Sequence, residues 1–211
     1  MAGSIFNSYS YPNPSSFTAC RFNCDATGLG DICFYTNTAG DILPSYYYIA
    51  GFGWKSLSIK DNVFDCNTAF PLTVRPYGVY GLMTGMNITS TTSGPGNSFS
   101  NLSYGVFSVP FIFGSGGPLT LTNNTFDNNS YGLYASGVAY GLTVKGNHFG
   151  VPHYTGYNAT GITVAGCIGY YLGYNTFEKS STTTLPYFGD IGITANNGRA
   201  NALKIGCSNS H

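Results

Sequence analysis

The chain has 211 residues, and its eight Lys and Arg residues balance its eight Asp and Glu residues to a net charge of zero. Charged residues make up only 8% of the sequence, against about a quarter in an ordinary soluble protein, which excludes a basic nucleic-acid-binding surface and a bundle of charged surface helices. The abundance of Gly, Tyr and Phe predicts strands and tight turns instead, and no apolar run is long enough for a membrane-inserted helix.

A triplet of the form Asn-x-Phe recurs along the chain and predicts an internal repeat. The first copy is Cys20-Arg21-Phe22, in which Cys replaces Asn. The complete copies begin at Asn62, Asn97, Asn124, Asn147 and Asn175. The shortest unit runs from Asn124 to residue 146, which is too short for a four-stranded propeller blade.

Alternating aliphatic residues lead into the triplet, as in Leu119-Thr120-Leu121, and predict a strand with one buried face. A second strand, of the type Tyr77-Gly78-Val79-Tyr80, follows the triplet. Two strands and one corner per unit fit a coil of a parallel β-helix, in which consecutive coils stack about 4.8 Å apart. We therefore predict an all-β fold with a single β-helix domain over residues 1–211, whose coils start near residues 20, 62, 97, 124, 147 and 175.

The two fixed residues of the triplet predict two ladders along the axis. Asn tolerates the left-handed backbone conformation that a sharp corner needs, and stacked Asn side chains can hydrogen-bond to one another. The Phe two residues later is expected to point inward and to stack on the Phe of the next coil. The members of this second ladder are Phe22, Phe64, Phe99, Phe126, Phe149 and Phe177.

The pattern aliphatic-x-aliphatic-x-x-Asn-x-Phe, followed by Tyr/Thr-Gly-aliphatic, resembles the repeat of pectate-lyase-like proteins. It is most similar to the large secreted β-helix proteins of Bacteroidetes-type bacteria. The resemblance covers about residues 15 to 205 and implies a right-handed parallel β-helix of about six coils, but no activity, because this repeat is structural. Such proteins commonly carry a C-terminal sorting domain, which this sequence lacks, so we expect the chain to be a segment of a longer protein.

Cys24 and Cys66 each lie four residues after the first residue of a triplet and so occupy the same position on adjacent coils. Stacked side chains about 5 Å apart are close enough for a disulfide, although disulfide geometry is strict. The alternative is a ladder of small buried residues with free thiols, and the spacing leaves both hypotheses open. No Cys-x-x-Cys pair is present, which argues against a zinc site.

Asp65, Asp127 and Glu178 each follow the Phe of a triplet and predict a row of acids. Ser100 and Gly150 hold that place in the intervening coils, so neighbouring acids should lie about 10 Å apart, too far to share a metal ion. The sequence also lacks a nucleophile elbow, a phosphate-binding loop and a metal motif. We therefore expect a solvated corner rather than a catalytic site, and neither a metal nor another cofactor.

The longest insertion carries Tyr46, Tyr47 and Tyr48, followed by Phe52 and Trp54. Adjacent residues of a strand point to opposite faces, so at least one of these tyrosines should lie outside the core. Exposed aromatic residues often bind sugar rings or other partners. We interpret Tyr46, Tyr47, Tyr48 and Trp54 as a candidate ligand-binding site; the alternative is that the insertion folds back and buries them as a cap.

These features predict a non-catalytic scaffold or adhesion segment of a secreted or cell-surface protein. A first alternative is a β-helix that binds or degrades polysaccharides, as a lyase or hydrolase, with a cell-surface glycan as its partner. A second alternative is a solenoid that stacks end to end into fibres through the unpaired strand edges of its terminal coils. Carboxylates that converge on a groove would favour an enzyme, whereas a flat face with exposed aromatic residues would favour binding.

Overall fold

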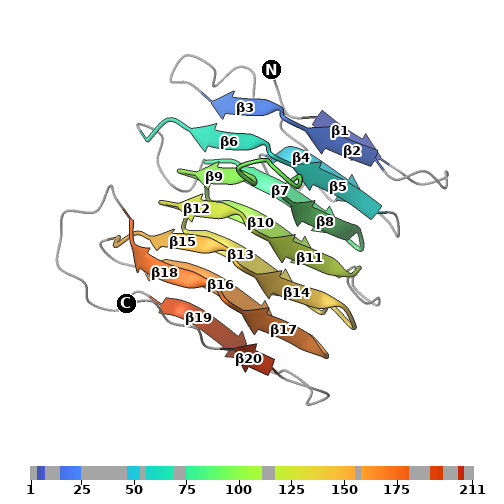
Figure 1. The fold of residues 1–211 in the computed structure, drawn as a ribbon, viewed down its shortest axis with the longest axis vertical. Coiled ribbons are helices and arrows are strands. Elements are labelled where there is room, and N and C mark those ends of the chain that lie inside the picture. Colours follow the sequence, from blue (N-terminus) through green and yellow to red (C-terminus); the bar gives the residue numbers. More distant parts are fainter. Residues whose placement is uncertain are drawn as a thin grey trace, which may run out of the picture.

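The computed structural model of the chain describes residues 4–7, 15–24, 47–52, 56–68, 75–110, 117–154, 158–180, 191–196 and 204–206. In this part of the chain the strands pair in parallel and no helix occurs, so none of its segments is a helix that could cross a membrane. The prediction of an all-β parallel β-helix is therefore confirmed. Figure 1 shows the strands as stacked, aligned arrows, with β1 to β3 at one end and β19 and β20 at the other.

The described strands form three parallel sheets, which we call sheets A, B and C. The seven described strands of sheet A are β1 (Ser4–Asn7), β4 (Tyr47–Phe52), β7 (Tyr77–Leu82), β10 (Tyr104–Val109), β13 (Tyr131–Ser136), β16 (Thr160–Ala165) and β19 (Ile191–Asn196). The seven of sheet B are β2 (Ser15–Thr18), β5 (Ser56–Lys60), β8 (Gly85–Thr89), β11 (Leu119–Thr122), β14 (Leu142–Lys145), β17 (Tyr170–Gly173) and β20 (Lys204–Gly206). The six described in sheet C are β3 (Arg21–Cys24), β6 (Val63–Cys66), β9 (Ser98–Ser100), β12 (Thr125–Asp127), β15 (His148–Val151) and β18 (Thr176–Lys179).

Successive strands enter sheets A, B and C in turn, so a coil has three strands where the sequence pattern predicted two. The additional strand begins inside the triplet itself. In Asn124-Thr125-Phe126 the corner ends at Asn124, and β12 starts at Thr125. The prediction was wrong on this point because the strands of sheet C are only three or four residues long, too short to show a clear alternation.

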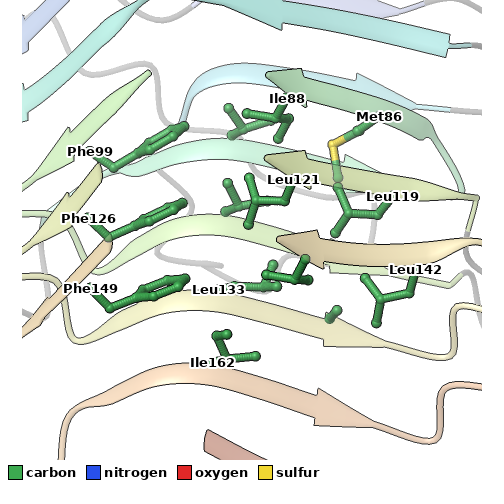
Figure 2. Close-up of a cluster of buried hydrophobic side chains, with 14 of the residues drawn as sticks. Met86, Ile88, Phe99, Leu119, Leu121, Phe126, Leu133, Leu142, Phe149 and Ile162 are labelled. Atoms are coloured by element: carbon green, nitrogen blue, oxygen red, sulfur yellow. The ribbon is translucent and has the colours of Figure 1, made fainter. Parts of the chain in front are cut away.

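The interior is filled by columns of apolar side chains from all three sheets. All six Phe residues of the triplets lie in one column from sheet C, with successive ring centroids 4.7 to 5.2 Å apart and ring planes within 10° of parallel. Figure 2 shows part of this column facing aliphatic residues such as Leu119 and Leu121 of β11 and Leu133 of β13. Burying one such side chain stabilises the fold by about 1.5–3 kcal/mol, so the repeat supplies a comparable contribution from every coil.

The asparagine ladder is confirmed. The Oδ1 atom of one ladder Asn accepts hydrogen bonds from the backbone N–H (2.9–3.2 Å) and from the side-chain Nδ2 (2.7–3.1 Å) of the ladder Asn before it. The ladder residues are Asn62, Asn97, Asn124, Asn147 and Asn175. The backbone N–H of Cys20 donates to Asn62 Oδ1 at 2.8 Å, so Cys20 occupies the equivalent corner of the first coil.

The corner itself is built differently from the prediction, because the ladder Asn is not the left-handed residue. The residue directly before it has a positive φ in every coil: Ala19 (55°), Asp61 (54°), Gly96 (82°), Asn123 (56°), Gly146 (67°) and Tyr174 (56°). The preceding residue makes the turn, and the ladder Asn is then free to direct its amide along the axis. Sequence alone did not identify this position because its residue types differ from coil to coil.

Replacing Asn124 by Ala should lower the free energy of unfolding by about 3 kcal/mol, because the buried N–H of Asn97 and the carbonyls of Ile88 and Thr122 lose a partner. Asn87 is exposed on the outer side of β8 and provides the matched control, since Asn87→Ala should change stability by less than about 0.5 kcal/mol. Urea denaturation measures both values. Similar losses in the two variants would show that the ladder does not hold the coils together.

Candidate functional site

Six aromatic side chains project outward from three neighbouring strands of sheet A and form one continuous surface, which we call the aromatic face. Its residues are Tyr77 and Tyr80 of β7, Tyr104 and Phe107 of β10, and Tyr131 and Tyr134 of β13. All six side chains are half-buried. The aliphatic residues between them, Val79, Val106 and Leu133, are fully buried in the core.

The glycine of the motif Tyr-Gly-aliphatic-aromatic allows both aromatic residues to face outward. Residues three apart on a regular strand point to opposite faces, yet Tyr104 and Phe107 lie on the same side because Gly105 and Val106 are both buried. Gly105 is also skipped where β10 pairs with its neighbours. A Cβ atom at Gly105 would lie 2.6 Å from the Gly132 carbonyl oxygen and 2.7 Å from Phe126 Cδ1, so only glycine fits there.

The six rings form two columns that run along the axis. The first column is Tyr77, Tyr104 and Tyr131, with ring centroids 4.6 Å and 4.7 Å apart. The second column is Tyr80, Phe107 and Tyr134, with centroids 5.5 Å and 5.1 Å apart. Tyr104 and Phe107 also meet edge to face at 4.9 Å, so each column supports the other and the rings are held in fixed positions.

Stacking determines which part of each ring a ligand can reach. Tyr104 and Tyr131 are within 7° of parallel, and the rings of the second column within 14°, so these rings cover each other's faces, whereas Tyr77 meets Tyr104 edge to face at 60°. The outer surface therefore offers ring edges and phenolic hydroxyl groups. Thr160 and Thr163 of β16 pair with Tyr131 and Tyr134 beside this surface, and both threonine side chains are buried.

The aromatic face carries no charge. Burial raises the pKa of the Tyr104 hydroxyl far above its ordinary value of 10.0, and the neighbouring Tyr77, Tyr131 and Tyr134 raise it further. The seven described strands of sheet A contain no charged residue. Lysines occur instead on sheet B, at Lys60, Lys145 and Lys204, and on sheet C, at Lys179, where the acids discussed next also lie.

The acidic row of sheet C has the spacing that the sequence indicates. Its register runs Asp65, Ser100, Asp127, Gly150 and Glu178, so that neighbouring acids are two strands apart. Glu178 Oε1 pairs with His148 Nε2 at 2.8 Å on an exposed part of the surface. The residues that the structure describes include no group of three His, Cys, Asp or Glu side chains that could hold a metal ion.

Cys24 and Cys66 occupy directly paired positions on β3 and β6. Cys66 is buried, whereas the side chain of Cys24 lies outside the described residues, so the disulfide and thiol hypotheses both stay predictions. The same corner holds asparagines in the next two coils. There Asn128 Nδ2 donates to Asn101 Oδ1 at 2.6 Å, and Asn101 Nδ2 donates to Asp65 Oδ1 at 2.9 Å, which makes a second, shorter amide ladder.

Two residues of the predicted aromatic site, Tyr47 and Tyr48, belong to strand β4 of sheet A. The backbone of Tyr47 pairs with that of Tyr77, which places it one coil beyond the first column. Tyr46 and Trp54 lie outside the described residues, and the role of all four residues in binding stays a prediction.

The sequence pattern predicted a strand at the motif Tyr-Gly-aliphatic-aromatic but not the aromatic face that the motif builds. The available signal was the second aromatic residue, three positions after the first Tyr, at Tyr80, Phe107 and Tyr134. A regular strand would have directed these residues to the face opposite the first Tyr. Only the bend at the glycine brings both columns to one side.

Comparisons of the chain with protein-family models, with curated proteins and with solved structures each found no match. The resemblance to pectate-lyase-like proteins therefore extends no further than the parallel β-helix, and a function has to be inferred from the geometry.

Gly105→Ala should destabilise the protein by about 3 kcal/mol, because the added methyl group would meet the Gly132 carbonyl and the Phe126 ring. Gly166→Ala is the matched control, because its Cβ would have no atom within 4 Å and only its φ of 61° is unfavourable, at a cost of about 1 kcal/mol. Thermal and urea denaturation distinguish the two. A loss at Gly105 no larger than at Gly166 would refute the close approach of the coils at the bend.

Proposed function

We propose that this chain is a non-catalytic scaffold segment of a secreted or cell-surface protein, and that it adheres to a partner through the aromatic face. The observation that carries this proposal is an uncharged surface of six rings over three adjacent strands, with hydroxyl groups along its outer edge. Contiguous aromatic surfaces of this kind are typical of recognition sites.

The rigidity of the support favours recognition. Behind the aromatic face, the side chains of Val79, Val106 and Leu133 are fully buried, and each coil is joined to the next by the asparagine and phenylalanine ladders. Stacked tyrosine rings have few rotamers left to lose when a partner binds, so little conformational entropy opposes the association. A site on strands also keeps its geometry better than one on loops.

The acids of the described residues support a non-catalytic role. Asp65 and Asp127 are separated by Ser100, and Asp127 and Glu178 by Gly150, which corresponds to about 9.6 Å between strands. A retaining glycosidase needs its two carboxyl groups about 5 Å apart and an inverting one about 6.5–9.5 Å, so the acidic row does not fit the first class and reaches only the upper limit of the second. Glu178 is moreover paired with His148, and its side chain is 63% exposed to solvent.

A carbohydrate-binding site on sheet B is the second candidate. Tyr171 lies on the outer side of β17 with its ring against Gly173, where it takes the space of a side chain. A ring that lies along the sheet offers its open face, on which a sugar ring can stack. Lys145 is paired with Gly173, and its Nζ lies 5.4 Å from the ring centre of Tyr174, which is 54% exposed. This group favours a sugar that carries polar or acidic substituents.

Binding of the purified chain to an array of glycans and to a panel of cell-surface glycoproteins tests the proposal. The variant Tyr80→Ser/Tyr134→Ser removes hydroxyl-bearing edges of the second column and should weaken binding at least about tenfold. Tyr140→Ser is the control, since Tyr140 is 70% exposed and lies outside both candidate surfaces, and it should bind like the wild type.

Each other outcome points to a different function. Loss of binding in Tyr171→Ser alone would move the site to sheet B. Release of an ultraviolet-absorbing product from acidic polysaccharides would establish a lyase and contradict the proposal. Large concentration-dependent assemblies in sedimentation would support the fibre-forming alternative, and a wild-type chain that binds no probe would argue against adhesion through the aromatic face.

A further inference from the structure

The first column of the aromatic face brings three tyrosine rings together, with Tyr104 and Tyr131 stacked and Tyr77 edge to face against Tyr104. Tyr77, Tyr104 and Tyr131 are directly paired across β7, β10 and β13, so their side chains leave the sheet in the same direction about 4.8 Å apart. The rings of Tyr104 and Tyr131 are stacked at 4.7 Å with planes 7° from parallel. Each ring is attached to the sheet at one end, so the hydroxyl group and the two carbon atoms beside it form its outer edge.

We propose that this column is a site of oxidative cross-linking, at which a one-electron oxidant joins Tyr104 to Tyr131, and secondarily Tyr77 to Tyr104, as dityrosine. The oxidant class is a haem peroxidase acting with hydrogen peroxide. Each phenol gives up one electron and its hydroxyl proton and becomes a phenoxyl radical. The two radicals form a carbon–carbon bond between positions ortho to oxygen, and the ortho hydrogens move to the oxygens and restore both phenols. One hydrogen peroxide takes up the two electrons and two protons and becomes two waters.

Stacking makes this pair the preferred one. Radical coupling is fastest between rings that are already neighbours, because the reacting carbons need only a small motion to meet. Tyr104 and Tyr134 are 6.1 Å apart and nearly perpendicular, and Tyr131 and Tyr134 are 6.2 Å apart and nearly perpendicular. These diagonal pairs are therefore the slower alternatives.

The second column provides an internal control within the native chain. Tyr80 and Tyr134 are separated by Phe107, which has no hydroxyl group and cannot form a phenoxyl radical. The two tyrosines lie two strands apart, at about 9.6 Å. The second column should therefore give no link along its length, although its rings are stacked in the same way.

A link between Tyr104 and Tyr131 would connect consecutive coils through their outer side. It would join β10 to β13 covalently and restrict the unfolded chain, as a disulfide does. The linked protein should therefore unfold at a higher urea concentration than the unlinked protein. Cross-linking at the aromatic face would stabilise the scaffold, whether or not the face also binds a partner.

The test oxidises dilute protein with a haem peroxidase and hydrogen peroxide, isolates the monomer, and identifies linked peptides by mass spectrometry and dityrosine fluorescence. The expected major product is the Tyr104–Tyr131 link, with the loss of two hydrogen atoms. The same oxidation in denaturing urea should abolish this preference. Monomer with equal amounts of all tyrosine pairs, or with links only in urea, would overturn the proposal.

Two single substitutions test the proposal further, one by removing a link and the other by adding links. Tyr131→Phe should remove the major link and leave the weaker Tyr77–Tyr104 link. Phe107→Tyr should add links from residue 107 to Tyr80 and Tyr134, because it completes a second tyrosine column with centroids at 5.5 Å and 5.1 Å. This gain does not depend on the stability of the first variant. Failure of Phe107→Tyr to form a new link, in a folded protein, would contradict the proposed dependence on stacking.

Discussion

The whole architecture depends on parallel strands that stack in register, so that each residue lies about 4.8 Å from its counterpart in the next coil. A side chain that can stack on or hydrogen-bond to an identical side chain stabilises the fold when it is repeated in consecutive coils. Two like charges at about 4 Å instead repel by about 1 kcal/mol even in water. The described strands of sheet A accordingly contain no charge. On sheet C the acids are separated by Ser100 and Gly150. The scarcity of charge in the composition follows from this constraint.

The same constraint explains how the coils tolerate corners of different length. The ladder Asn and the Phe keep their places while the residues before them vary, and insertions are accommodated outside the ladders. Asp61 illustrates this arrangement, because its carboxylate accepts hydrogen bonds from the backbone N–H groups of Thr91 and Gly96 and orders the turn of the next coil. Hydrogen bonds from the Thr91 side chain and from these two N–H groups hold the pKa of Asp61 below its ordinary value of 3.8.

The parts of the structure that repeat could be predicted from the sequence, and the parts that depend on backbone direction could not. The spacing of Asn124 and Asn147 and their aliphatic flanks was enough for the parallel β-helix and the amide ladder. The left-handed corner residue could not be predicted, because Gly96, Asn123 and Tyr174 have the same backbone conformation but different side chains. The aromatic face could not be predicted either, because Gly105 and Val106 are both buried and so interrupt the regular alternation of inward and outward side chains on the strand.

Hydrogen exchange of the side-chain amides, followed by nuclear magnetic resonance, tests the central constraint most directly. In-register stacking buries the Nδ2 groups of Asn97, Asn124 and Asn147 and engages each with the Asn of the following coil. These amides should exchange only on global unfolding, whereas the amide of the exposed Asn87 should exchange freely. Ladder amides that exchange as fast as that of Asn87 would show that the coils are not held in register by this ladder.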